Sequence, residues 1–357
     1  MLSGALGMRI SDFDYDLPEE LIAQAPIEPR DAARLLVVPP GGPFAHRLIT
    51  ELPALLAPGD LLVLNDTRVI PARLLGRKES GGKVELLLCE PLAGGLGSRW
   101  RAMGQASKSI RAGARLQFDG LAAVVEAAEG AGFYTVVLDR EGEALEEALA
   151  RAGRLPLPPY IRREPDAHDR ERYQTILARS PGSAAAPTAG LHFTPALLER
   201  LAARGIARTT VTLHVGPGTF LPVRAERLDD HRMHGERYEV PVQAAEAVAA
   251  ARSRGGRVIA VGTTSARTLE SAWRGGRLVP GEGRTELFIR PGHPFGAVDA
   301  LLTNFHLPRS TLLVLACALG GRERILEAYR EAVVRRYRFF SYGDAMLIER
   351  IRSTSVE

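Results

Sequence analysis

Short runs of mostly apolar residues alternate with helix-like patterns along most of the chain. Such runs between turn residues predict strands at 34–38, 61–64 and 257–261. From about residue 156 onward, strands expected at 209–215 and 285–289 alternate with amphipathic segments. Helices are predicted at 18–25, 195–204, 243–254, 266–273, 311–319 and 325–337. This alternation predicts an α/β domain with a mixed sheet and packed helices.

The segment 71–155 has a different pattern. Glycine-containing turns separate five expected strands, at 84–89, 100–103, 115–118, 122–126 and 134–138. Several short strands in succession are typical of a small barrel or sandwich. Because segments of α/β character lie on both sides, we predict that 8–70 and 156–357 form one discontinuous catalytic domain. The segment 71–155 is then an inserted small β-barrel domain, followed by a stiff proline-rich linker at 154–160.

Composition excludes several classes of protein. The 357 residues leave room for two domains, and 45% hydrophobic with 25% charged residues is ordinary for a globular chain, which excludes a disordered chain or a collagen. The longest apolar runs are far shorter than the roughly 18–20 residues of a membrane span. Two cysteines, Cys89 and Cys317, exclude a disulfide scaffold and favour a cytoplasmic location. A net charge of +4 permits a polyanionic partner without requiring one.

One predicted strand leads into a glycine-containing turn. The segment 211–220 continues from that strand through His214, Gly216, Gly218 and Thr219. Glycines at a strand end let backbone N–H groups approach a ligand closely, at the edge where α/β folds bind ligands. A Gly-Pro-Gly turn with a structural histidine is the alternative.

A second turn follows the strand 257–261. It runs through Gly262, Thr263, Thr264 and Ser265 into a predicted helix. Hydroxyl and free N–H groups at a helix N-terminus suit a carboxylate, a phosphate or a ribose. The turn matches neither a phosphate loop nor G-x-G-x-x-G, so nucleoside triphosphates and dinucleotides are poorly supported. Ordinary N-capping by a hydroxyl explains the same residues.

Two more segments carry histidines beside small or polar residues. His192 lies in the loop 186–193, and Asn304 and His306 precede a proline within 301–311. Histidine titrates near neutral pH, and an amide can read the edge of a nucleobase. A surface histidine, and a capping turn in which Asn304 bonds its own backbone, are the alternatives.

His231, His234 and Glu236 have the residue types of metal ligands. Their spacing is not H-E-x-x-H, and no third histidine has a fixed offset. A hydrogen-bonded turn, or a histidine that faces substrate, is the favoured interpretation, so no metal is predicted.

Two features suggest binding to nucleic acid. The segment 337–346 combines aromatic residues with Arg338, and Tyr342 within it could stack on a base, although core packing explains at least one of the phenylalanines. Between Glu90 and Asp119 no acidic residue occurs. That stretch contains Arg99, Arg101, Lys108, Arg111 and Arg115. It predicts a face for a phosphate backbone, or else a solvated turn region.

Several stretches of the chain form one ordered set. They are 12–18 (DFDYDLP), 58–73 (PGDLLVLNDTRVIPAR), 173–175 (YQT), 185–193 (AAPTAGLHF), 213–220 (LHVGPGTF), 231–234 (HRMH), 261–265 (VGTTS), 303–308 (TNFHLP) and 337–348 (YRFFSYGDAMLI). Together they resemble one family, the S-adenosylmethionine:tRNA ribosyltransferase-isomerases (QueA) of queuosine biosynthesis. The family's fold is an α/β domain with an inserted β-barrel, as the pattern of elements also predicts.

The resemblance implies a transferase-isomerase. The enzyme would move the ribosyl part of S-adenosylmethionine onto 7-aminomethyl-7-deazaguanine at the wobble position of a tRNA, and isomerise it. Epoxyqueuosine-tRNA, adenine and methionine would be released. S-Adenosylmethionine is then a consumed co-substrate, with no metal or redox cofactor. We expect a cytoplasmic enzyme without membrane contact; the sequence leaves its oligomeric state open and a monomer is favoured.

Roles follow from residue type and position in the matching stretches. The reaction needs a base for the acidic proton beside the sulfonium and an acid for the departing adenine. Both are expected among His192 and His214, with His306 and His234 in reserve. Contacts with S-adenosylmethionine are expected from Gly216, Gly218, Thr219, Gly262, Thr263, Thr264, Ser265 and Asn304. Contacts with tRNA are expected from Arg68, Arg73, Arg99, Arg101, Lys108, Arg338 and Tyr342.

Two other classes of function remain open. A methyltransferase would use the same donor and release S-adenosylhomocysteine, but the chain lacks a G-x-G-x-x-G-like turn near its start. An RNA-binding module would not consume the donor at all.

Overall fold

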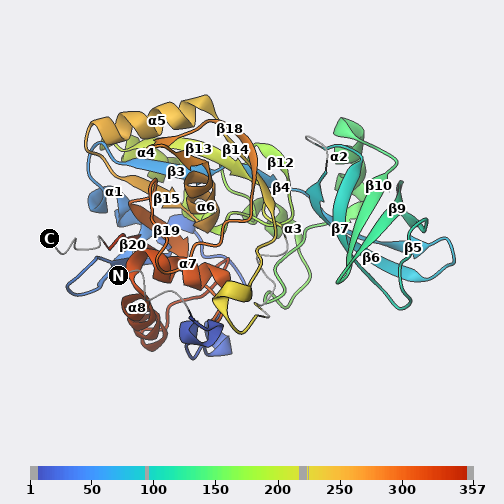
Figure 1. The fold of residues 1–357 in the computed structure, drawn as a ribbon, viewed down its shortest axis with the longest axis horizontal. Coiled ribbons are helices and arrows are strands. Elements are labelled where there is room, and N and C mark those ends of the chain that lie inside the picture. The colour runs from blue at the N-terminus through green and yellow to red at the C-terminus, as the bar shows by residue number, and fades with distance from the viewer. Residues whose placement is uncertain (1–6, 93–95, 217–222, 224, 352–357) are drawn as a thin grey trace.

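The computed structural model describes residues 7–351 except 93–95, 217–222 and 224. Two sheets dominate it, one large and open, the other small and closed (Figure 1). The closed sheet lies to one side of the larger part. Within the described residues, no helix is long and apolar enough to cross a membrane.

The large sheet has nine strands and is mixed. In spatial order they are β18 (Gly281–Thr285), β14 (Glu236–Val240), β13 (Ala207–Leu213), β3 (Leu61–Asn65), β15 (Val258–Val261), β19 (Ala300–Asn304), β20 (Ala345–Glu349), β1 (Arg34–Val38) and β2 (Ala45–Leu48). The four central strands β13, β3, β15 and β19 are parallel. Antiparallel pairs occur on both sides of them, so the predicted mixed sheet is confirmed.

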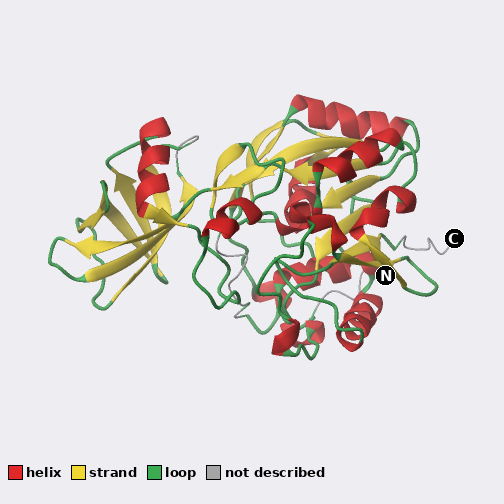
Figure 2. Cartoon of the chain, turned by 180° about the vertical axis from the view of Figure 1, so that it is seen from behind, coloured by secondary structure: helices red, strands yellow, loops and turns green. Residues whose placement is uncertain are grey.

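Helices cover both faces of this sheet (Figure 2). One face packs on α5 (Val242–Ser253), α6 (Thr263–Ala272), α7 (Thr311–Gly320) and α8 (Arg322–Val334). The other packs on α1 (Leu52–Leu55) and α4 (Pro195–Ala203). Along β3, Leu61 and Val63 point to the first face, whereas Leu62 and Leu64 point to the second. Burial on both faces explains why the central strands are continuous apolar runs without alternation.

The small sheet is an inserted antiparallel barrel, as predicted. Its strands are β5 (Arg73–Lys78), β6 (Lys83–Pro91), β7 (Arg99–Ala106), β10 (Phe133–Leu138), β9 (Leu121–Gly130) and β8 (Arg115–Phe118), and β8 pairs with β5 to close it. The short β11 (Gly153–Arg154) adds to β5. Where β8 pairs with β5, neither strand is a free edge.

The expectation that the insert contains only strands is wrong. Helix α2 (Gly142–Ala152) follows the last barrel strand, and Leu145, Ala148 and Leu149 pack into the barrel core beside Trp100. These positions repeat at helical spacing, but the strong strand signals before them dominated the prediction. The helix therefore closes the apolar interior that the strands leave open.

The barrel is joined to the large sheet at the carboxyl end of β3. From there the chain passes through β4 (Thr67–Val69), which pairs with β12 (Ser180–Ser183), and it returns before α3 (Ala167–Arg172). Arg68 and Glu146 form an ion pair of 2.7 Å between β4 and α2. Arg284 and Glu90 form another between β18 and β6.

Two predicted elements of the large part differ from the structure. In place of a helix at 18–25 there is a single 3-10 turn, η2 (Glu19–Leu21). The following residues instead pair with Phe339, whose N–H donates to the Leu21 carbonyl at 2.8 Å. The strand expected at 285–289 ends at Thr285, because its hydroxyl accepts the N–H of Leu287 at 3.1 Å and turns the chain. A hairpin of β16 (Trp273–Arg274) and β17 (Arg277–Leu278) completes the strands.

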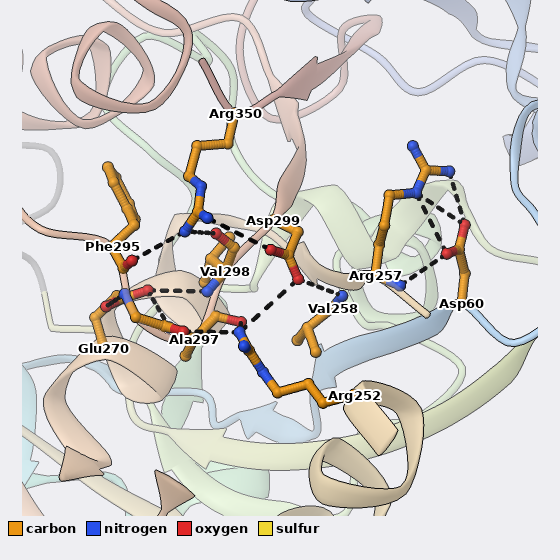
Figure 3. Close-up of polar contacts among 11 residues, drawn as sticks. Asp60, Arg252, Arg257, Val258, Glu270, Phe295, Ala297, Val298, Asp299 and Arg350 are labelled. Carbon is orange, nitrogen blue, oxygen red and sulfur yellow. Dashed lines mark hydrogen bonds and ion pairs between the residues drawn. The ribbon is translucent and has the colours of Figure 1, made fainter. Parts of the chain in front are cut away.

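Charged side chains connect the amino ends of the central strands (Figure 3). Asp60, just before β3, accepts hydrogen bonds from the Arg257 backbone at 3.0 Å and from its guanidinium at 2.7 Å. Asp299, just before β19, accepts the N–H of Val258 at 3.0 Å. These contacts set the register of β3, β15 and β19 at the edge opposite the barrel.

Candidate active site

The carboxyl ends of β15 and β19 open into a cavity beside the sheet. This cavity holds about 660 Å³ of space up to its mouth. Its lining comes from both strand ends, from the loop 186–189 and from the segment before β20. The carboxyl edge of parallel strands is where open α/β sheets bind ligands, so the position supports a ligand site.

The turn after β15 forms one wall. Gly262 has a φ of 89°, a left-handed conformation that favours glycine, and α6 begins directly after it. Thr263 and Thr264 line the cavity together with Gly262. Ser265, predicted to join them, is buried and donates its hydroxyl to the Val261 carbonyl at 2.8 Å. Its role in this structure is to hold the first turn of α6.

Asn65, at the end of β3, supports that wall. Its Nδ2 donates to the Leu213 carbonyl at 2.9 Å and to Thr264 Oγ1 at 3.2 Å. Its Oδ1 accepts the N–H groups of Thr67 and Leu213 at 3.0 and 3.1 Å. This one amide connects β3, β13 and α6, and the sequence analysis did not single it out.

Asn304 and His306 form the wall at the end of β19, and both line the cavity. His306 Nε2 lies 2.9 Å from Thr303 Oγ1. Burial lowers the pKa of His306 to about 3, so its imidazole is neutral at physiological pH. Asn304 Nδ2 lies 3.2 Å from His192 Nε2, so two of the predicted site residues meet directly.

His192, predicted to lead the catalysis, lies behind Asn304 at the end of η5 (Thr188–His192). It is buried and is not part of the cavity lining. Burial, opposed by the nearby Asp344 carboxylate, lowers the pKa of His192 to about 4. The loop that carries it does line the cavity at 186–189, as the small residues there predicted.

His214 lies at the end of β13, one residue before Val215, which lines the cavity. Its Nδ1 is 2.8 Å from Thr67 Oγ1. Burial and the charge of Arg237 lower the pKa of His214. Gly216, next along, donates its N–H to Glu236 Oε1 at 3.2 Å. The predicted Gly218 and Thr219 lie outside the described residues.

His234 lies far from this wall, against the barrel. Its ring centroid is 5.6 Å from that of Phe133 on β10. Burial and the nearby Arg101 lower the pKa of His234. Glu236 forms a buried ion pair with Arg267. Among the residues that the structure describes, no cluster of histidine, cysteine, aspartate or glutamate has the arrangement of a metal site.

An aromatic wall completes the cavity, and the sequence analysis missed one of its residues, Tyr160. Phe340 and Ser341 line the cavity, and Tyr160 joins them from the segment that returns from the barrel. The Tyr160 hydroxyl lies 2.5 Å from Ser341 Oγ, and its ring centroid is 4.7 Å from that of Phe340. Phe340 has a φ of 69°, a left-handed conformation that is rare for a bulky residue and typical of functional sites. The signal for Tyr160 was absent, because the segment reads only as an extended linker.

The comparisons with known proteins agree with this geometry. A family described as "Queuosine biosynthesis protein" matches residues 10–348. A protein of Anaeromyxobacter dehalogenans (strain 2CP-C) called S-adenosylmethionine:tRNA ribosyltransferase-isomerase is 75% identical over 344 residues, 96% of this chain and 100% of the relative. The chain belongs to this family. The resemblance seen in the sequence is thereby confirmed.

More distant members agree over the same length. A relative of the same name from Geobacter sulfurreducens is 54% identical over 96% of this chain and 100% of its own. A crystal structure of S-adenosylmethionine tRNA ribosyltransferase from Thermotoga maritima is 40% identical, with a TM-score of 0.55. It covers 95% of this chain and 100% of its own.

Most arginines expected to contact tRNA already have carboxylate partners. The pairs are Arg68 with Glu146, Arg73 with Glu85, Arg99 with Glu126 and Arg101 with Glu129, at 2.7 to 2.8 Å. Arg338 is half-buried and donates to the Ala25 carbonyl. Tyr342 is buried and donates its hydroxyl to Asp169 Oδ1 at 2.8 Å.

Lys108 and two arginines of the same stretch differ from this group. Lys108, Arg111 and Arg115 are exposed on the barrel. Over the described part of the chain, none of them has an ion-pair partner. The charge that remains available on the acid-free stretch is therefore concentrated at these residues rather than at Arg99 and Arg101.

Proposed function

We propose that the chain transfers and isomerises the ribosyl moiety of S-adenosylmethionine onto 7-aminomethyl-7-deazaguanine at the wobble position of a tRNA. The products would be epoxyqueuosine-tRNA, adenine and methionine. The observation that carries this proposal is the 75% identity, over 96% of the chain, with a relative named for that activity. The cavity at the carboxyl edge of the large sheet supports it.

The cavity is our proposed site for S-adenosylmethionine. Asn304 would contact the adenine, because an amide matches the edge of a nucleobase. Gly262, Thr263 and Thr264 would contact the methionine carboxylate or the ribose, since α6 begins there with free N–H groups. Gly216, Gly218 and Thr219 remain proposed contacts from the β13 side, whereas Ser265 would act only by holding α6.

His306 leads our proposal for proton transfer. Of the four predicted histidines, it is the one that lines the cavity in the described structure. Its neutral imidazole could accept a proton from the carbon beside the sulfonium. His214 lies beside the cavity and follows it. His192 contacts Asn304 rather than the cavity, and His234 lies against the barrel. We therefore rank both after His306 and His214 as candidates for proton transfer.

The barrel is our proposed platform for tRNA. Its exposed cations Lys108, Arg111 and Arg115 could contact phosphates without losing a carboxylate partner. We propose Arg68, Arg73 and Arg338 as further contacts with tRNA.

The pairing of β11 with β5 supports domain boundaries at 71 and 155. We further propose a cytoplasmic monomer, because the expected substrate is a tRNA.

A product assay tests this function. The chain is incubated with S-adenosylmethionine and a tRNA that carries 7-aminomethyl-7-deazaguanine, and the small products are separated. Adenine and methionine in equal amounts support the proposal. S-Adenosylhomocysteine would indicate a methyltransferase, and tRNA binding without consumption of the donor would indicate an RNA-binding module. His306→Ala and His214→Ala then test the two histidines, and full turnover removes that residue from the mechanism.

A further inference from the structure

The side-chain amide of Asn304 is held in one orientation. Its Nδ2 faces three acceptors, which are His192 Nε2 at 3.2 Å, the Phe340 carbonyl at 3.1 Å and the Asp344 carbonyl at 3.4 Å. Turning the amide over would place its oxygen against the oxygens of these two carbonyls and the imidazole nitrogen. Three acceptors on one side of the amide therefore fix the nitrogen there.

The opposite atom of the same amide is left unpaired. Asn304 Oδ1 is buried and has no hydrogen-bond partner among the described residues. Its side chain is buried and belongs to the cavity lining. Buried polar atoms in native proteins are nearly always paired, so an orphaned acceptor beside a cavity indicates a donor on the ligand.

His192 is part of this arrangement although it does not reach the cavity. Because Nε2 accepts from Asn304, the ring proton is on Nδ1, and the residue also has a backbone hydrogen bond with Arg30. Both ring nitrogens are thus engaged. The low pKa of His192, about 4, leaves the ring neutral at physiological pH, with a single proton on its two nitrogens. A protonated ring would present a donor instead and would favour the turned amide.

We propose that Asn304 and His192 together select the purine of the donor, Asn304 by contact and His192 as a positioning residue. Asn304 Oδ1 accepts a hydrogen bond from the 6-amino group of adenine, and His192 prevents the amide from turning to offer its NH₂ to a 6-oxo group. This inference rests on the proposed use of S-adenosylmethionine. The cavity should then reject a 6-oxo purine, because the 6-oxo oxygen and Asn304 Oδ1 are both acceptors and would face each other without a hydrogen bond.

The test compares two donors on the full chain. They are S-adenosylmethionine and S-inosylmethionine, in which an oxo group replaces the 6-amino group. The unchanged chain is expected to favour the amino donor by roughly 100-fold or more in kcat/KM, because a site that hydrogen-bonds a substrate group strongly rejects the analogue without it. His192→Leu is expected to reduce that ratio by roughly 10-fold or more, mainly through KM, whereas His192→Gln, which can again offer an acceptor, restores part of it.

A matched control is His46→Leu. His46 is a half-buried histidine on β2 whose Nδ1 lies 2.8 Å from the Tyr337 hydroxyl, away from the cavity lining. This variant should leave the ratio unchanged. The inference is overturned if the unchanged chain uses both donors equally, a comparison that needs no variant. It is also overturned if His192→Leu slows both donors by the same factor, as a purely structural residue would. Failure of the proposed function itself is distinguishable, because the unchanged chain would then consume neither donor.

Discussion

Replacing Asp60 by asparagine should destabilise the large sheet by about 3 kcal/mol. The Asp60 carboxylate is almost fully buried and accepts from the Ala57 N–H at 2.9 Å, the Arg257 N–H at 3.0 Å and the Arg257 guanidinium at 2.7 Å (Figure 3). The two N–H groups bond different carboxylate oxygens. An amide has one oxygen, so one buried N–H loses its partner, and its NH₂ group faces the guanidinium.

The magnitude follows from these losses. One unpaired buried N–H costs about 1–3 kcal/mol, and removing one partner of a buried ion pair costs about 3–5 kcal/mol in all. We expect the loss for Asp60→Asn at the lower end of the 3–5 kcal/mol range, because the Arg257 side chain is 32% exposed to water and keeps its ion pair with Glu349 at 2.9 Å. Glu349→Gln is the matched control, since it removes the other carboxylate from the same guanidinium. Glu349 is itself 33% exposed, so we expect a loss below about 1 kcal/mol.

Urea unfolding followed by tryptophan fluorescence measures the effect. The chain has two tryptophans, Trp100 in the barrel core and Trp273 beside α6. A Trp100→Phe background makes Trp273 the reporter of the large sheet for all variants. Equal losses for Asp60→Asn and Glu349→Gln would refute the reasoning, because burial would then contribute nothing to the difference.

The pH dependence of unfolding tests the role of Asp60 independently. Burial raises the pKa of Asp60, but its hydrogen bonds from Arg257 and Ala57 outweigh burial and the pKa is lowered. Because the pKa of Asp60 is lower in the folded chain than in the unfolded chain, where it is about 3.9, the ionised carboxylate stabilises the fold at pH values above about 3.9. This contribution is lost as the pH falls through the pKa of the folded state. The gap between the unchanged chain and Asp60→Asn should therefore narrow below about pH 4.

Three further outcomes are expected. Asn65→Asp should cost about 2 kcal/mol or more in urea unfolding and raise the KM for S-adenosylmethionine, because a carboxylate cannot donate to Leu213 and Thr264; an unchanged KM would contradict the role of that wall. Burial lowers the pKa of His306 to about 3. Below about pH 6.5 the unfolded chain therefore binds a proton at this histidine that the folded chain does not bind, so the free energy of unfolding decreases as pH falls. His306→Gln should flatten this slope by up to about 1.4 kcal/mol per pH unit, and an unaltered slope would show that His306 is not buried neutral. Lys108→Ala should lower the salt dependence of tRNA affinity by about one unit in the log–log slope, whereas Arg99, already paired with Glu126, should change it little when replaced by alanine.

Much of the architecture was readable from local pattern. The strand at 34–38 is observed as β1 with the same bounds, and the helix predicted at 195–204 is α4 (Pro195–Ala203). The strand is a short apolar run and the helix has an amphipathic pattern, and both have clear stop signals, which act within a few residues. The family was also recognisable, because its motifs occur in order along one chain and need no spatial information.

The predictions that were wrong concern segments whose structure depends on residues far away in the chain. Residues after η2 pair with Phe339, more than 300 positions away, and this long-range pairing replaces the predicted helix. In the same way, the acid-free stretch of the barrel is not free of acids in space, since Arg99 and Arg101 reach Glu126 and Glu129 on β9. Charge counted along the sequence cannot show such pairs across a sheet.

The sequence by itself determined the class of fold, the insertion of a barrel and the family, because apolar periodicity, turn residues and ordered motifs are local properties. Only the tertiary structure decided which motif residues share a cavity. It brought Asn304, His306, Gly262 and Tyr160 into one cavity, and it placed His192 against the side-chain amide of Asn304. The physical reason is that burial, hydrogen-bond partners and pKa depend on what packs around a side chain, and that is set by segments far away in the chain.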